Sequence, residues 1–199
     1  MLTIFTSMFI FALIGAISPG PVNIIATSAG AQFGFKKALP HVIGATISYT
    51  LIVFIAGIAL AQITHIIPQI TIWFKFIGGS FLLYMAYKIA TTAPTSITSS
   101  HNKLPPKYAE GALSQLLNPK AWLVSLSGVS LFVSGNTPEI LYLMIFCLIS
   151  FTVCFISIST WAALGHIIQD FLSSTKKQIV FNLIMALLLA SSVFSLFIE

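Results

Sequence analysis

Charged residues are scarce in this 199-residue chain. They make up 7% of the sequence, against roughly 25% in soluble domains, whereas 57% of the residues are hydrophobic and the mean hydropathy is +1.01. This composition excludes a soluble globular protein. Arginine is absent, and nine lysines against four acidic residues give a net charge of +5. Because the lysines fall in short connections and not on a basic face with aromatic residues, nucleic-acid binding is disfavoured.

Cysteine is equally rare, with only Cys147 and Cys154, both inside one apolar run. No extracellular disulfide framework is therefore expected. On one helix the two thiols would lie about 10.5 Å apart along the axis, beyond disulfide reach, so packing is the preferred role. The sequence also lacks metal-ligand spacing among His, Cys, Asp and Glu and lacks a nucleotide-binding loop. We expect no cofactor, no metal and no enzymatic activity.

Long uncharged apolar runs dominate what is present, and several exceed the roughly 20 residues that cross a bilayer. Polar interruptions leave six apolar segments, approximately 2–32, 39–64, 69–90, 110–133, 139–168 and 179–198. The sequence therefore predicts an all-α membrane protein with six transmembrane helices. A β-barrel is disfavoured because the apolarity is continuous. A cleaved signal peptide is disfavoured because the first segment lacks a basic start and stays apolar for too long.

One connection is long and polar, and it divides the chain into two halves. We expect a first three-helix half over residues 1–90, a cytoplasmic linker over 91–108 and a second three-helix half over 109–199. An odd number of helices per half makes the second half enter the membrane from the opposite side, as in inverted-repeat transporters. No clear residue-level repeat accompanies this arrangement, so the expected symmetry rests on topology.

The lysines indicate the orientation in the membrane. Connections one, three and five carry seven lysines, Lys36, Lys37, Lys88, Lys103, Lys107, Lys176 and Lys177. The opposite side offers Glu139 and Glu199, with no lysine in its loops. By the positive-inside rule those three connections are cytoplasmic, and both termini face outward across a bacterial inner membrane. Lys75, near the outer end of the third helix, is expected to extend its amine to the interface.

The first apolar segment contains Ser18, Pro19, Gly20 and Pro21, a combination that no continuous helix favours. Each proline removes a backbone donor and clashes with the carbonyl four residues earlier, so the carbonyls of residues 15 and 17 need other partners. Pro21 suits the first position of a new half-helix, which would leave the N–H groups of residues 22–24 unpaired at a positive dipole end. Such an end binds carboxylates.

The fourth segment repeats the device with Asn118, Pro119 and Lys120. Asn118 is expected to cap a half-helix that starts at Pro119. Lys120 lies about ten residues, or roughly 15 Å, from the start of the segment, which is about half the hydrocarbon thickness. A lysine at that depth costs about 2.5–3.5 kcal/mol or more unless it is paired or hydrated. We therefore interpret Lys120 as a site residue, although pairing with a neighbouring carbonyl would be a purely structural alternative.

Two histidines lie near the expected cytoplasmic ends of helices. His41 lies at the start of the second segment, and His166 lies four residues before Asp170, close enough to pair with it on one helix face. Because water is available near an interface, a structural role is favoured for both histidines over proton transfer.

Several motifs together resemble the lysine exporter and homoserine/threonine resistance (LysE/RhtB) family of amino-acid exporters. The residues that carry this resemblance are Ser18 to Pro21, Gly34, Lys36, Tyr84 to Lys88, and Asn118 to Ala121. The stretches 88–91, 161–166 and 186–189 are most similar to the cysteine/O-acetylserine exporter branch. The resemblance covers nearly the whole chain. It implies secondary export driven by the proton gradient and, for so small a chain, favours a homodimer in the lipid bilayer.

Two departures from the family pattern bear on the substrate. Many family members carry an acidic residue shortly after the Pro-Gly-Pro turn and another in the second helix, whereas this chain has Asn23 and Tyr49. Both changes weaken the case for proton coupling and for cationic substrates. We therefore expect an exporter of small neutral amino acids or their derivatives. A membrane thiol redox carrier and a non-transporting membrane subunit are the alternatives.

The expected substrate site lies between the two broken helices, near the membrane midplane. Its candidate residues are Ser18, Pro19, Gly20, Pro21, Asn23, Tyr49, Asn118, Pro119 and Lys120. The substrate carboxylate would face the half-helix N-termini and Lys120. Its ammonium would meet the carbonyls of Gly15, Ile17 and Gln115.

Overall fold

The computed structural model describes residues 2–18, 20–63, 76, 80, 83–84, 86–91, 104–168, 171–172 and 174–195. Within these residues every regular element is an α-helix, which confirms the all-α prediction. The helices are α1 (Leu2–Ile17), α2 (Pro21–Phe33), α3 (Phe35–Ile63), α5 (Tyr108–Leu116), α6 (Pro119–Phe132), α7 (Glu139–Ile167) and α8 (Thr175–Ser195). Most of the predicted third segment, with Lys75, lies outside the described residues.

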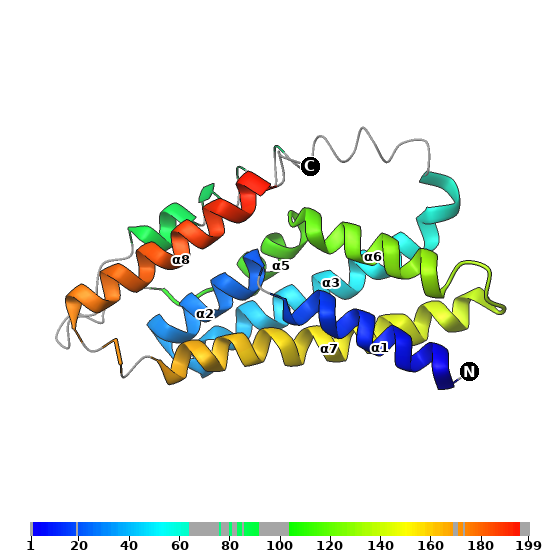
Figure 1. Cartoon of the computed structure of the whole chain (residues 1–199), viewed down its shortest axis with the longest axis horizontal. Coiled ribbons are helices and arrows are strands. Elements are labelled where there is room, and N and C mark those ends of the chain that lie inside the picture. The colour runs from blue at the N-terminus through cyan, green and yellow to red at the C-terminus, as the bar shows by residue number, and fades with distance from the viewer. Residues whose placement is uncertain are drawn as a thin grey trace.

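Two of the predicted apolar segments are each divided between two helices. The first becomes α1 and α2, whose directions differ by 59°, and the fourth becomes α5 and α6, which are separated by Leu117 and Asn118. Figure 1 shows α1 and α2 as successive helices with a change of direction between them. Pro19, one of the residues predicted to cause this interruption, lies outside the described residues.

Among the described helices, α3 and α7 are long and apolar enough to cross a membrane. A third span follows if α1 and α2 are counted as one bent crossing. On α3 the large exposed side chains are Ile47, Leu51, Ile55 and Ile58, spaced three to four residues apart along one face. An apolar helix face of this kind suits contact with lipid.

The helices pack most closely at glycines, which have no side chain to keep them apart. A Cβ at Gly30 or Gly165 of the α2–α7 contact would collide with the backbone of Ala162 or Thr27. A Cβ at Gly111 of α5 would likewise collide with the backbone of α3. In Figure 1, α2 accordingly runs beside α7. These contacts hold α2 closely against α7 and α5 closely against α3.

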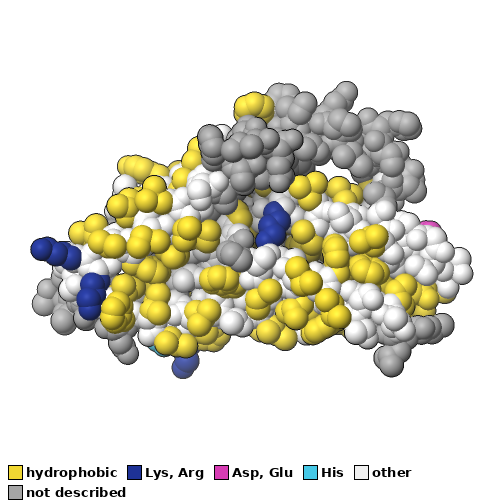
Figure 2. Space-filling view, in the orientation of Figure 1, with side chains coloured by type: hydrophobic (Ala, Val, Ile, Leu, Met, Phe, Trp, Pro, Cys, Tyr) yellow, Lys and Arg dark blue, Asp and Glu magenta, His cyan; other side chains and the backbone are white. Residues whose placement is uncertain are grey.

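A second apolar cluster lies on the other side of α2. Ile24 and Ile25 pack there with Ala86 and Ile89, and with Ala186 of α8. Figure 2 shows apolar side chains spread over the visible face, with Lys side chains at the end where α8 begins. A further Lys patch lies in the middle of that face.

Candidate functional site

One small pocket lies where the α1–α2 junction meets the α5–α6 junction, and α3 and α7 complete its wall. Six of the nine predicted site residues line it: Ser18, Gly20, Asn23, Tyr49, Asn118 and Lys120. The cavity measures about 40 Å³, room for roughly three water molecules. Among the described residues of its lining, none is acidic. The only ammonium group of the lining therefore has no carboxylate beside it.

Lys120 connects the two junctions directly. Its Nζ donates to Ser18 Oγ at 2.7 Å and approaches the Ser18 backbone oxygen at 3.4 Å. Ser18 Oγ in turn donates to the carbonyl of Gly15 at 3.1 Å. Lys120 is half-buried, and within the described part of the chain its ammonium donates to these two neutral oxygen atoms of Ser18. These oxygens partly compensate the cost of placing a cation at this depth.

The α6 end of the site follows the predicted capping pattern. Pro119 is the first residue of α6, and Asn118 is its N-cap, whose Oδ1 accepts from the Lys120 backbone N–H at 3.2 Å. Asn118 Nδ2 also donates to Gln115 Oε1 at 3.3 Å, which links the cap to the last turn of α5. The first turn of α6, with its positive dipole end, is thereby fixed at the pocket.

On the other side of the site, helix α2 begins at Pro21, also as predicted. Gly20 before it has φ −162° and ψ 173°, an extended conformation open to any residue. A Cβ there would lie 3.4 Å from Lys120 Nζ, in ordinary contact with it, so side chains longer than alanine would meet the Lys120 amine. The Ile24 N–H donates to the Gly20 carbonyl at 3.0 Å. The prediction that this N–H is unpaired was therefore wrong. The carbonyl of the N-cap residue Gly20 accepts the N–H four residues later, as in any regular first turn.

The carbonyls expected to receive a substrate ammonium each have a partner within the protein. Gly15 accepts from Ser18 Oγ, Ile17 from Trp161 Nε1 at 3.1 Å, and Gln115 from the Asn118 N–H at 3.1 Å. These hydrogen bonds compensate for the helix bonds that the interruptions remove.

Asn23 has a defined structural task at the first interruption. Its Nδ2 donates to the carbonyls of Ala16 at 2.8 Å and Ser18 at 3.0 Å, and so ties the start of α2 to the end of α1. An acidic side chain at this position would lack the N–H donor that both carbonyls use. Asn23 therefore stabilises the bend in addition to lining the pocket.

Comparisons with known proteins agree with this arrangement. Residues 13–199 match the family model described as LysE type translocator. The chain belongs to the LysE family. Among its relatives is the cysteine/O-acetylserine efflux protein of Salmonella paratyphi A, 28% identical over 188 residues and 92% of each chain. The proteins of that name from Escherichia coli O1:K1 and Klebsiella pneumoniae are 27% and 25% identical, over 94% and 84% of each chain. No solved structure matches the chain.

Membership of the LysE family makes this protein a membrane transporter and not an enzyme. Its pocket includes side chains that the sequence analysis did not assign to a site, notably Gln115 and Cys154. Gln115 Nε2 lies 3.9 Å from Cys154 Sγ, with the amide as donor. Gln115 precedes Asn118 by three residues, a spacing that places two side chains next to each other, so the sequence could have indicated that Gln115 lies at the site. Cys154 is buried and free, like Cys147, and no local sequence signal marks it as a pocket residue.

His41 of this LysE-family protein has no access to water, contrary to the expectation from the sequence. A structural role was expected because water is available near an interface. In the structure His41 has no exposed surface, and neither ring nitrogen makes a hydrogen bond of accepted geometry. The reason given for its structural role was therefore wrong. His166 is exposed, as expected, whereas Asp170 lies outside the described residues.

Proposed function

We propose that this protein exports small neutral amino acids or their derivatives across the cytoplasmic membrane and that the proton gradient drives the export. The observation that carries this proposal is the pocket between the two interruptions, which holds one lysine ammonium and no acidic lining residue among those described. The names of the relatives, cysteine/O-acetylserine efflux proteins, indicate small amino-acid substrates. Family membership favours transport over the thiol redox carrier and the non-transporting subunit.

Binding of an amino acid requires the pocket to change. A cavity that holds roughly three water molecules is smaller than an amino acid, which has five or more non-hydrogen atoms. The Lys120 side chain occupies part of this space through its contacts with Ser18. On our proposal the substrate carboxylate draws the Lys120 ammonium away from Ser18 and binds it together with the N-terminus of α6.

The substrate ammonium then takes the place that the Lys120 ammonium leaves. Ser18 offers two oxygen atoms there, the side-chain Oγ and the backbone carbonyl, which already accept from one ammonium group. This assignment replaces the carbonyls of Gly15, Ile17 and Gln115, which have partners within the protein. Each charge of the zwitterion thus meets a partner supplied by a different interrupted helix.

The charge of Lys120 also explains why substrates with neutral side chains would be preferred. A lysine or arginine substrate would bring a second cation into a lining that already contains Lys120. No acidic residue occurs in the sequence before Glu110, so the α1–α2 region and α3 supply no counter-charge. Leaving such a cation unpaired at membrane depth costs about 2.5–3.5 kcal/mol or more, enough for strong discrimination.

The wider architecture is part of the proposal. We retain two inverted three-helix halves, over 1–90 and 109–199, joined by a cytoplasmic linker over 91–108. The lysine distribution supports cytoplasmic connections at these points and termini on the outside. A homodimer in the inner membrane is likewise retained from the family resemblance.

Reconstituted vesicles provide the direct test. Purified protein is incorporated into lipid vesicles, and exchange of radiolabelled alanine, serine, cysteine, O-acetylserine and lysine is measured across the membrane. We expect exchange of one or more of the neutral compounds and none of lysine. Vesicles that move none of the panel, while the protein is correctly inserted, would contradict the proposed function.

A further inference from the structure

His41 is the most completely buried ionisable side chain in the described part of α3. It has 0% exposed surface, and neither Nδ1 nor Nε2 has a hydrogen-bond partner of accepted geometry. The Val22 carbonyl acts on the ring without a hydrogen bond of that geometry, and no side chain among the described residues pairs with it. Buried polar groups in native proteins are almost always well paired, so a fully buried imidazole with this environment calls for a functional explanation. Imidazole is also the side chain whose charge in water changes between pH 5 and pH 8.

The surroundings of His41 connect the pocket with the expected cytoplasmic surface. The polar groups that act on the ring are the backbone carbonyl of Val22 and the carboxylate of Glu110. Val22, in the first turn of α2, lines the pocket. Gly111 packs against the backbone of His41 so closely that a Cβ would collide with it. The ring therefore lies behind the pocket wall, in a contact between helices that leaves little room for water.

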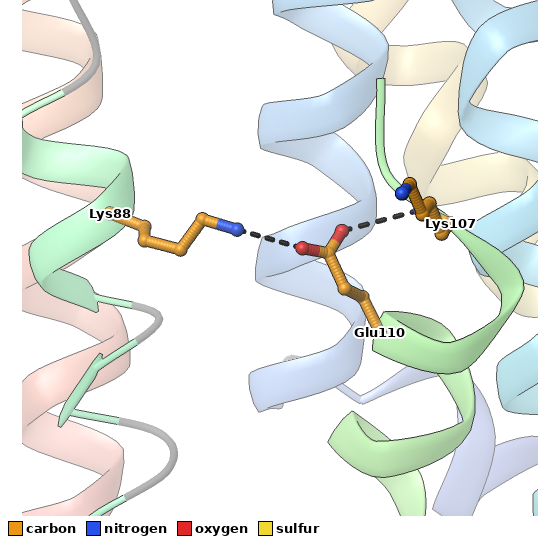
Figure 3. Close-up of polar contacts among 3 residues, drawn as sticks. All are labelled: Lys88, Lys107 and Glu110. Carbon is orange, nitrogen blue, oxygen red and sulfur yellow. Dashed lines mark hydrogen bonds and ion pairs between the residues drawn. The ribbon is translucent and has the colours of Figure 1, made fainter. Parts of the chain in front are cut away.

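Glu110 forms the other end of this connection. Its Oε1 accepts from Lys88 Nζ at 2.7 Å and its Oε2 from the Lys107 backbone N–H at 3.2 Å, as Figure 3 shows. The Glu110 side chain is 32% exposed, so it reaches solvent while its charge acts on His41. Lys88 and Lys107 belong to the connection that the lysine distribution predicts to be cytoplasmic, and Glu110 lies in the first turn of the helix that follows it.

Several other ionisable groups lie on α3 and on the helices packed against it. They are Lys36, Lys37 and Tyr49 on α3, Tyr108 on α5, Lys120 on α6, and Glu139, Tyr142, Cys147, Cys154 and His166 on α7. The sequence of α2 contains none. Among the described groups, Glu110 is the one whose charge acts on the His41 ring.

We propose that His41 is the proton-binding site of the transporter and that Glu110 connects it with the cytoplasm. This inference rests on the proposed function, and it supplies a proton carrier in a region without carboxylates. When the pocket opens outward, the helices packed around His41 part and admit external water, and a ring nitrogen then accepts one proton and becomes an imidazolium. When the pocket closes to the outside, the imidazolium transfers that proton to the Glu110 carboxylate, which releases it to cytoplasmic water.

Exchange of proton for substrate follows from charge. The imidazolium lies behind Val22, next to the junction where Ser18 is proposed to hold the substrate ammonium. Two cations so close together in a poorly hydrated region repel each other strongly. Protonated His41 therefore disfavours bound substrate, and bound substrate disfavours protonation. One pocket can then carry an amino acid outward and a proton inward in alternation.

The test separates coupling from transport in reconstituted vesicles. Uptake of labelled O-acetylserine, or of the panel compound that wild type exchanges fastest, is measured in vesicles made acidic inside. Exchange of the same compound without a pH difference is measured in parallel. We expect His41→Gln and His41→Asn to lose uptake driven by the pH difference while exchange persists. His166→Gln, an exposed histidine on α7, serves as the control and should retain both activities.

Glu110→Gln provides a second, independent variant, since it leaves His41 in place. We expect slower pH-driven uptake with exchange unchanged, because the carboxylate that receives the proton is missing. Wild-type pH-driven uptake in either His41 variant would overturn the inference. Wild type that exchanges substrate without responding to a pH difference would also overturn it, together with the proton-driven part of the proposed function, and would leave amino-acid transport itself intact. Wild type that moves no amino acid would instead contradict the proposed function itself.

Discussion

Replacing Lys120 with methionine tests whether Lys120 binds the substrate carboxylate. Methionine keeps the apolar stem and removes the ammonium. A hydrogen bond to a charged group contributes about 1.5–3 kcal/mol, so affinity should fall about 10- to 150-fold. The fold should survive, because Ser18 Oγ keeps Gly15 as the acceptor of its hydroxyl hydrogen bond. Removal of the lysine also abolishes a cost of about 2.5–3.5 kcal/mol for a charge at membrane depth, so the melting temperature should hold or rise.

The assay compares an amino acid with its methyl ester as competitors of labelled exchange. In wild type the ester should bind much more weakly, because it presents no carboxylate to Lys120. In Lys120→Met the difference between the amino acid and its ester should be much smaller, because only the N-terminus of α6 still favours the carboxylate. Lys120→Arg should retain part of the activity, and Lys37→Met, an exposed lysine at the start of α3, should behave as wild type. An ester penalty of the same size in wild type and Lys120→Met would refute the assignment of the carboxylate to Lys120.

Three further predictions concern the interruptions and the orientation. Gly20→Leu should insert normally but lose exchange, because a Cβ at Gly20 lies 3.4 Å from Lys120 Nζ and a longer side chain displaces that amine; Gly20→Ala should keep part of the exchange. Asn118→Ala should reduce thermal stability by about 0.5–2 kcal/mol, measured by thermal unfolding in detergent, since the α6 cap is lost. Cysteine at position 36 should react with membrane-impermeant maleimide from the cytoplasm and cysteine at position 136 from outside, and the reverse pattern would invert the orientation.

Local rules were sufficient to predict where the helices are interrupted. Pro21 and Pro119 each begin a helix, and Asn118 caps the second, because helix starts depend on the conformation of a few consecutive residues. The partner of Lys120 could not be predicted in this way. Ser18 lies 102 residues earlier in the chain, and its contact with Lys120 depends on how the two junctions pack.

The error on His41 has a related cause. Its place in the sequence gives its depth along α3, and depth alone suggested access to interfacial water. Burial depends instead on the neighbours around the helix, and here Gly111 allows α5 to approach until His41 has no exposed surface. The partners of the interrupted carbonyls escaped prediction for the same reason. Trp161 reaches Ile17 from α7, 144 residues away.

Specificity for a zwitterion follows from the contact between Lys120 and Ser18. A carboxylic acid without an amine can draw Lys120 away, but it leaves the Ser18 oxygens without the ammonium that they bind in the empty protein. An amine without a carboxylate can compete for Ser18, but it leaves Lys120 without a negative partner at membrane depth. Only a molecule with both charges replaces every contact that it removes. Because Ser18 belongs to the first interruption and Lys120 to the second, the same molecule must bridge both junctions, so substrate binding changes the contact between the two interrupted helices.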